Sequence, residues 1–411
     1  MYFIYVGAVG YKSVMPSLIS WLDANTAETN RMREMVRLFE LPGSIDDLAL
    51  GQFRDVISNS LFPGTSVLHV AARYLILIPW CYQAGRLASS GEEQRAAGEH
   101  TERRLIRNLQ GLGAKRFIGS DIGDRISSLP SAAYWSSLRR WGIVADGVDR
   151  TNIGDEMLRE AQAHKTGIPT QRVWNATLPP VPDGFPASND RGMELTREEA
   201  LWIQDRILAT APNTLLAHII SKPHLVRKKS WAPWDDHGCL ESQGEAALWL
   251  RHAQAYSILQ WGLDSTYAHL LDEESSLKFT NQPDSETSMH SYAPLDDWVG
   301  DGETRLLLRE WDLDDFLHRA RAVNPRIPFA SFTFLSSAVK ELTSSEHPSK
   351  NTTLHRLVKQ REQQAKRSNS RFVNLRRLRE WKAPDAFGRQ TFRWAQVRTL
   401  ANDVAEGLKS A

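Results

Sequence analysis

The chain has 411 residues, of which 41% are hydrophobic and 24% are charged, and its formal net charge is +1. These proportions are typical of a folded globular protein and exclude a largely disordered chain. The length suits two or three domains of ordinary size. Only two cysteines occur, Cys81 and Cys239, which excludes a disulfide framework and favours a reducing compartment.

The apolar stretches are too short or wrongly flanked for membrane insertion or export. The first residues, MYFIYVGAVGYKS, have no basic residue ahead of the apolar stretch and no small-residue cleavage pattern, so we expect no signal peptide. The most apolar run, RYLILIPWCY at 73–82, is shorter than the ~20 residues that a membrane helix needs. We predict a cytoplasmic protein without membrane contact.

Apolar residues recur at the spacing of amphipathic helices through most of the chain. Pro130 is well placed to begin a helix that Gly142 ends, and TREE at 196–199 is a capping-box sequence. The best strand candidate is RIPFASFTFLSS, 326–337. We therefore predict an all-α or α-dominated, multi-helical fold with few short strands. The predicted helical segments are 26–41, 45–62, 91–113, 130–142, 196–208 and 244–263.

The run at 73–82 is predicted to be a buried helix or strand that Pro79 breaks or ends. Trp80 and Tyr82 would anchor its packing, since large aromatic side chains dominate the energetics of protein cores. Arg73 directly precedes the run, so we expect it to pair with a buried carboxylate.

Composition changes along the chain predict its domain organisation. Residues 176–193 are rich in proline and glycine and are expected to form a linker or exposed loop. Residues 272–304 are expected to be irregular. The predicted parts are an N-terminal extension 1–19, an N-terminal helical domain 20–175, the linker 176–193, a second helical domain 194–345 with an acidic insertion 269–316, and a basic helical C-terminal region 346–411.

Charge is distributed very unevenly. Residues 350–411 carry fifteen Lys and Arg against five Asp and Glu, a net of +10, whereas residues 269–316 carry thirteen Asp and Glu against three Lys and Arg, a net of −10. Arginines interleaved with aromatic residues favour contact with a nucleic-acid backbone. Two other interpretations stay open: both blocks are solvated faces, or they pair with each other.

We predict that the basic C-terminal region contacts DNA phosphates. Two smaller basic patches could assist: Arg139 and Arg140, on the second helix of a helix-turn-helix variant, and the sequence RKKSW at 227–231. No cofactor is expected. The candidate nucleic-acid-binding residues are Arg367, Arg371, Arg376, Arg377, Arg379, Lys382, Arg389, Arg393, Arg398, Arg139, Arg140, Arg227, Lys228 and Lys229.

Standard catalytic motifs do not occur in the sequence. There is no GxxxxGK[ST] loop and no GxSxG elbow, which argues against an NTPase and a serine hydrolase. Segment 224–239 contains metal-ligand residue types but lacks HExxH or CxxC spacing, and an exposed turn explains the same residues. We assign no catalytic residue and no metal ligand. The weighed ligand candidates are His224, Asp235, Asp236, His237 and Cys239.

Several segments, including SWLDA, RMREMVRLFE, LPSAAYWSSLRRWGI and RWAQVRTLANDVAEGL, resemble an uncharacterised bacterial family classified only as a domain of unknown function. The resemblance spans about residues 20–408, and its most specific part is the combination FPGT…ARY…PW between 62 and 80. Genes of this family tend to lie beside helicase-like and phospholipase D-like genes in antiphage defence islands. The first 19 residues and the acidic insertion fit the family pattern least well.

The resemblance implies a defence role, although it carries over no catalytic residues. We expect an accessory, non-catalytic subunit of a bacterial antiphage defence complex that binds DNA through its basic C-terminal surface. Helicase-like or phospholipase D-like proteins would be its partners. The alternatives are a metal-dependent nuclease with unassigned carboxylates and a protein–protein scaffold without nucleic-acid contact.

Overall fold

The computed structural model describes residues 48–85, 89–279, 293–382 and 389–410. These residues form sixteen α-helices and five short 3-10 helices, and their one β-type pairing is an isolated bridge between Val144 and Trp174. The predicted α-dominated fold is confirmed. No helix in these ranges is long and apolar enough to cross a membrane. The predicted helix at 26–41 lies outside the described residues.

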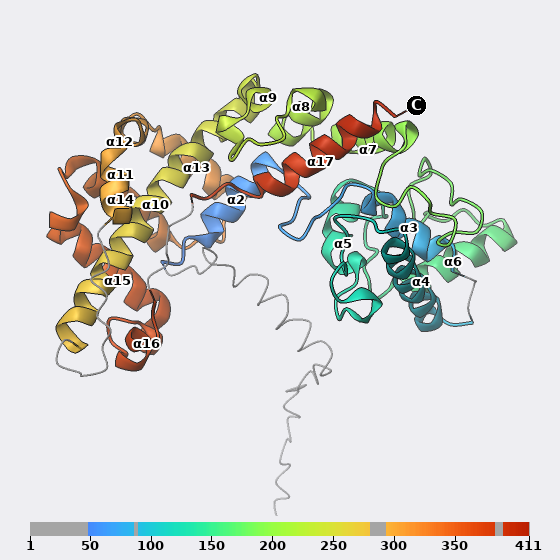
Figure 1. Cartoon of the computed structure of the whole chain (residues 1–411), viewed down its shortest axis with the longest axis horizontal. Helices are drawn as coiled ribbons and strands as arrows, with labels where there is room; N and C mark the ends of the chain where they lie inside the picture. The colour runs from blue at the N-terminus through green and yellow to red at the C-terminus, as the bar shows by residue number, and fades with distance from the viewer. Residues whose placement is uncertain (1–47, 86–88, 280–292, 383–388, 411) are drawn as a thin grey trace, which may run out of the picture.

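The helices form two lobes joined by a bridge (Figure 1). The α10 lobe contains α2 (Gly51–Leu61), α10 (Gly244–Phe279), α11 (Ala293–Gly300), α12 (Gly302–Arg309), α13 (Leu313–Val323), α14 (Phe329–Ser344), α15 (Thr352–Lys366) and α16 (Leu375–Arg379). The α3 lobe contains α3 (Tyr74–Gln83), α4 (Gly91–Gly111), α5 (Pro130–Arg140) and α6 (Ile153–Thr166). The bridge contains α7 (Arg197–Thr210), α8 (Leu215–Ser221), α9 (His237–Leu240) and α17 (Trp394–Gly407).

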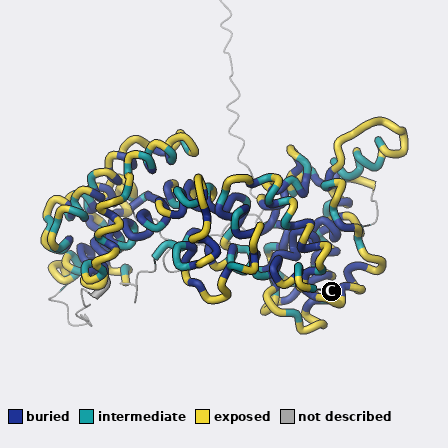
Figure 2. The backbone as a smooth tube through the Cα atoms, turned by 90° about the horizontal axis from the view of Figure 1, so that it is seen from above, coloured by how far each residue is buried: buried dark blue, intermediate teal, exposed yellow. Residues whose placement is uncertain are grey.

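Short 3-10 helices complete the connections between these elements. They are η1 (Gly123–Arg125), η2 (Pro223–Leu225), η3 (Pro233–Asp235), η4 (Pro348–Lys350) and η5 (Arg367–Asn369). Buried apolar side chains run without interruption from α2 to α17, and buried residues fill both lobes and the bridge (Figure 2).

The chain crosses between lobes more than once. Helix α2 packs on α10 and α13, although α3, which follows it in sequence, lies in the other lobe. Helix α17 returns from the C-terminal region to pack on α7 and α8. Residues 176–193 contain no helix, yet Pro179, Phe185 and Asn189 are buried, so this segment is anchored against the α3 lobe. The predicted domain division stays a prediction.

Helix α3 is apolar on every side, and its residues from Tyr74 to Tyr82 are all buried. A helix that is hydrophobic all round belongs in a core. Pro79 lies inside the helix, so the prediction that it would break or end the run is wrong. Packing against α4 and α5 stabilises the helix beyond the one backbone hydrogen bond that proline removes.

The predicted anchors of this run are confirmed. Trp80 packs edge-to-face on Phe185 with ring centroids 5.5 Å apart, and Tyr82 packs edge-to-face on Trp135 at 5.9 Å. Both side chains are buried.

Segment 326–337 is not a strand, because α14 begins at Phe329 and continues to Ser344. The phenylalanines and threonine suggested strand propensity, but Phe332, Leu335 and Val339 are buried at helical spacing, and α14 packs on α15. Tertiary packing therefore overrides local propensity here. The irregular structure expected for 272–304 is also wrong where the chain is described, since α10 continues to Phe279 and both α11 and α12 are helical; residues 280–292 lie outside the described ranges.

Local helix signals were more dependable. Thr196 and Glu199 form the predicted capping box: the Glu199 N–H donates to Thr196 Oγ at 3.1 Å, and the Thr196 N–H donates to Glu199 Oε2 at 2.9 Å. Pro130 is the first residue of α5, and Gly142 follows its end in the left-handed conformation, φ +61°.

Candidate functional site

Five of the predicted nucleic-acid-binding residues lie close together at the end of the α10 lobe. We call them the α16 basic surface: Arg367, Arg376, Arg377, Arg379 and Lys382, all of which are exposed. The buried side chain of Leu378 anchors helix α16 to the lobe. The side chain of Arg376, on the same helix, is 87% exposed. Asn374 caps the helix by accepting a hydrogen bond from the Arg377 N–H at 3.2 Å.

The acidic neighbour of this surface does not neutralise it. Glu380 accepts hydrogen bonds from Arg376 at 2.9 Å and from Arg377 at 3.4 Å, and the bond from Arg376 is the main reason that its pKa is lowered. Ion pairs this exposed contribute little to stability and exchange readily for other partners. The guanidinium of Arg379 lies 5.1 Å from the ring centre of Phe279, at the end of α10. The surface therefore presents several arginines that can turn to a phosphate.

Four other arginines that were predicted to contact DNA form hydrogen bonds inside the protein instead. Their guanidinium groups donate hydrogen bonds to other helices and loops, so we leave them out of the surface. They are Arg371 on Tyr267 Oη (2.8 Å), Arg389 on Asp301 Oδ2 (2.6 Å), Arg393 on the Thr65 carbonyl (2.8 Å) and Arg398 on the Ser230 carbonyl.

The acidic and basic blocks of the sequence meet in part. Lys359 Nζ lies 3.3 Å from Glu274 Oε2, and Arg389 Nη2 lies 2.6 Å from Asp301 Oδ2. Burial acts to raise the pKa of Asp301, but hydrogen bonds from Thr304 and Arg389 outweigh it and lower the pKa. Pairing between the blocks, one of the interpretations left open, thus accounts for part of the charge pattern but not for the α16 basic surface.

Arg139 and Arg140 are far from this surface, at the end of α5 in the α3 lobe (Figure 1). Arg140 Nη1 donates to the Thr210 carbonyl at 2.7 Å. A helix-turn-helix has a turn of about three or four residues, whereas residues 112–129 separate α4 from α5. The helix-turn-helix interpretation of this region is therefore wrong.

The residues of 224–239 that were weighed as metal ligands, and not assigned, lie in the loop between α8 and α9 and in α9 itself. Asp236 is fully buried and accepts hydrogen bonds from the Arg227 N–H (2.9 Å), Ser230 Oγ (2.7 Å) and the Gly238 N–H (3.0 Å). Cys239 is buried, and this burial raises the pKa of its thiol. His224 and His237 are exposed. Across the described ranges, no three His, Cys, Asp or Glu side chains are grouped so that they could hold a metal ion.

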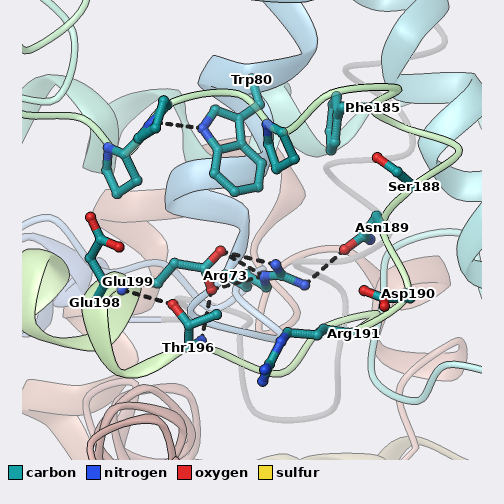
Figure 3. Close-up of a pocket in the computed structure, with 13 residues that line it drawn as sticks. Arg73, Trp80, Phe185, Ser188, Asn189, Asp190, Arg191, Thr196, Glu198 and Glu199 are labelled. Carbon is teal, nitrogen blue, oxygen red and sulfur yellow. Dashed lines mark hydrogen bonds and ion pairs between the residues drawn. The ribbon is translucent and has the colours of Figure 1, made fainter. Parts of the chain in front are cut away.

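A pocket of about 280 Å³ lies beside Arg73, between the proline-rich segment and the start of α7 (Figure 3). Arg73 Nη2 is 2.9 Å from Glu199 Oε1, which confirms the predicted buried carboxylate partner. Its Nη1 donates to Asn189 Oδ1 at 2.8 Å and to the Gly192 carbonyl at 2.9 Å. The arginine thus ties the start of α3 to α7 and to the loop that precedes α7.

The pocket brings together the apolar run 73–82, the proline-rich segment 176–193 and the start of α7. The Trp80 Nε1–H donates to the Pro179 carbonyl at 2.7 Å, which fixes the proline-rich segment over α3. The sequence predicts only a linker or exposed loop for the segment that contains the prolines, Phe185 and Asn189. The signal that could have found the pocket is the pair of bulky aromatic residues Trp80 and Phe185, one within the apolar run 73–82 and the other within the proline-rich segment 176–193.

Together these features define an all-helical, two-lobed protein with an exposed arginine-rich surface on one lobe. The chain belongs to a family of unknown function, DUF6361, whose model matches residues 16–407. This confirms the resemblance to an uncharacterised family over nearly the whole chain. Searches of curated proteins and of solved structures gave no match.

Proposed function

We propose that this protein binds DNA through the α16 basic surface, as an accessory, non-catalytic subunit of a bacterial antiphage defence complex in the cytoplasm. The observation that carries the DNA-binding proposal is the exposure of five cationic side chains within residues 367–382. By contrast, the nearby Arg389 and Arg393 donate hydrogen bonds to Asp301 and to the Thr65 carbonyl. The defence role rests on the family resemblance, in which helicase-like or phospholipase D-like partners would supply the chemistry.

The geometry favours contact with the phosphate backbone. Arginine guanidinium groups bind phosphate oxygens through two parallel hydrogen bonds, and such contacts release condensed counterions. Helix α16 has only five residues, Leu375–Arg379, too few to lie along a major groove and read several bases. We therefore expect binding that depends on salt and not on sequence.

Fluorescence anisotropy of a labelled DNA duplex at increasing salt tests the proposal. The variant R376E/R377E should weaken binding by about tenfold or more. It should also reduce the salt slope by about 2, because each phosphate that the protein neutralises adds about one to that slope. The matched control is K165E/R172E, which makes the same charge change at two exposed positions of the α3 lobe.

Equal weakening by the two double variants would show that net charge alone controls binding. Absence of binding by the wild-type protein at low salt would end the proposal. Magnesium-dependent cleavage of the duplex would favour the nuclease alternative instead, and co-purification of a protein partner after nuclease treatment, without duplex binding, would favour a scaffold.

A further inference from the structure

An exposed tryptophan follows the basic sequence of the loop between α8 and α9. Trp231 is 46% exposed, and Arg227, Lys228 and Lys229 just before it are also exposed. Tryptophan usually buries most of its large surface, and it is enriched at the interfaces where proteins bind partners. The loop lies at the bridge, away from the α16 basic surface (Figure 1).

The backbone that carries Trp231 is held in place. Buried Asp236 accepts hydrogen bonds from both ends of segment 227–230, and the Trp394 Nε1–H of α17 donates to the Ser230 carbonyl at 3.2 Å. The Trp231 N–H donates to Asp235 Oδ2 at 3.3 Å. The exposure of the ring is therefore set by a bonded loop rather than by a lack of anchoring.

The ring itself is also oriented. Trp234 packs against it edge-to-face, with centroids 5.7 Å apart and an angle of 87°. The Arg389 guanidinium lies 5.7 Å from the Trp231 ring centre and is held by its ion pair with Asp301. A ring already restrained in this way loses little conformational entropy when a second planar group stacks on it.

The charge next to the ring is suited to phosphates. Lys228 pairs with Glu406 at 2.6 Å, but the two side chains are 75% and 58% exposed, so this lysine can exchange partners at small cost. Lys229 stands one residue closer to Trp231 and is exposed. Aromatic side chains near cationic ones are typical of proteins that bind single strands, because every base has a face that can stack and every nucleotide carries a phosphate.

We infer that Trp231 is a stacking platform for one base of single-stranded nucleic acid, with Lys228 and Lys229 contacting the adjoining phosphates. The inference deepens the proposed function and rests on it only in assuming that the protein binds nucleic acid. A duplex hides its base faces in the stack, so Trp231 serves single strands while the α16 basic surface contacts duplex backbone.

The test compares three labelled ligands of equal length, about ten nucleotides: an oligothymidine, an abasic strand with the same phosphates, and a duplex. The W231A variant should bind oligothymidine between about 5-fold and about 100-fold more weakly, the effect measured when stacking residues are truncated to alanine. Its affinity for the abasic strand and for the duplex should not change. W231F should recover most of the oligothymidine affinity, since it keeps an aromatic face.

The matched control is F329A, which removes another exposed aromatic side chain, 75% exposed at the start of α14. It should leave all three affinities at the wild-type values. Equal oligothymidine binding by W231A and wild type, as expected if Trp231 contacts a protein partner, would overturn the inference. Equal weakening of all three ligands by W231A would also overturn it.

The two proposals can fail separately. Duplex binding that still depends on Arg376 and Arg377, together with no effect of W231A on oligothymidine, overturns the inference and leaves the proposed function standing. Absence of binding to every ligand overturns both.

Discussion

Removing one partner of the buried ion pair between Arg73 and Glu199 should strongly destabilise the α3 lobe, because it leaves the other charge buried and unpaired. Both side chains are 5% exposed, and Nη2 lies 2.9 Å from Oε1. Arg73 also donates to Asn189 Oδ1 and to the Gly192 carbonyl. Arg73→Met therefore leaves the buried Glu199 carboxylate without its counter-ion and takes one donor from each of two further acceptors, of which the Gly192 carbonyl keeps the hydrogen bond from Asn189 Nδ2. Breaking a buried pair by removing one partner costs about 3–5 kcal/mol.

A double-mutant cycle separates the pair from its surroundings. Glu199→Gln removes the charge but keeps an oxygen that can accept the Thr196 N–H of the capping box. The double variant R73M/E199Q buries no unpaired charge. Its cost should therefore fall short of the sum of the two single costs by about 1–3 kcal/mol.

Cys81 supplies a local assay. Its side chain is fully buried in α3, where burial raises the pKa of the thiol, so it reacts with an alkylating reagent only when this region opens. Because each 1.4 kcal/mol is a factor of ten, R73M should raise the alkylation rate of Cys81 by about 100-fold to about 5000-fold. Mass spectrometry of the Cys81 peptide measures the rate, and Cys239 in the bridge gives an internal reference.

The exposed Arg376–Glu380 pair provides the control, since R376M should leave the Cys81 rate unchanged. The reasoning is refuted if R73M alters that rate by less than about threefold, or if the costs of R73M and E199Q add without coupling.

Two further predictions concern buried groups of the α3 lobe. Burial raises the pKa of Glu102 from 4.5 to about 7, opposed by the hydrogen bond that its carboxylate accepts from the Ser131 N–H at 2.8 Å. The stability contributed by the protonated group is complete below pH 4.5 and is lost as the pH rises through about 7. E102Q should flatten this fall in thermal-denaturation curves recorded from about pH 4 to about pH 8, and an unchanged slope would contradict the assignment. A Cβ at Gly154 would lie 1.8 Å from the Gly91 carbonyl oxygen, so G154A should push α6 from α4 and cost about 1–3 kcal/mol. G111A meets nothing within 4 Å and should not lower the melting temperature, and equal effects of the two changes would refute the steric explanation.

Features that depend on a few neighbouring residues could be predicted from the sequence. The capping box at 196–199, the helix start at Pro130 and the burial of 73–82 follow from local hydrogen bonding, a fixed φ angle and an unbroken apolar run. The need of Arg73 for a carboxylate also followed, because a charge beside a core must be paired. That the partner is Glu199, 126 residues away, depended on the fold.

For the candidate site, the sequence predicts only that the C-terminal region is basic, and not which of its arginines are exposed. Arg376 and Arg389 are the same residue type in the same basic block, yet one is exposed and the other lies 4.5 Å from the centre of the Trp261 ring and bonds to Asp301, 88 residues away. Nothing in the local spacing distinguishes them. The exposure of Trp231 is decided in the same way, by Asp236 and by α17.

The sequence by itself determined the helical class, the individual helix boundaries marked by caps and the absence of an apolar run long enough for a membrane. Those properties depend on hydrogen bonds and side-chain periodicity within one turn or one segment. Tertiary structure alone decided that Pro79 stays within a helix, that 326–337 is helical, and which arginines reach solvent. The reason is that burial and the ion pairs of charged side chains are set by contacts between segments far apart in the chain, which outweigh local propensity.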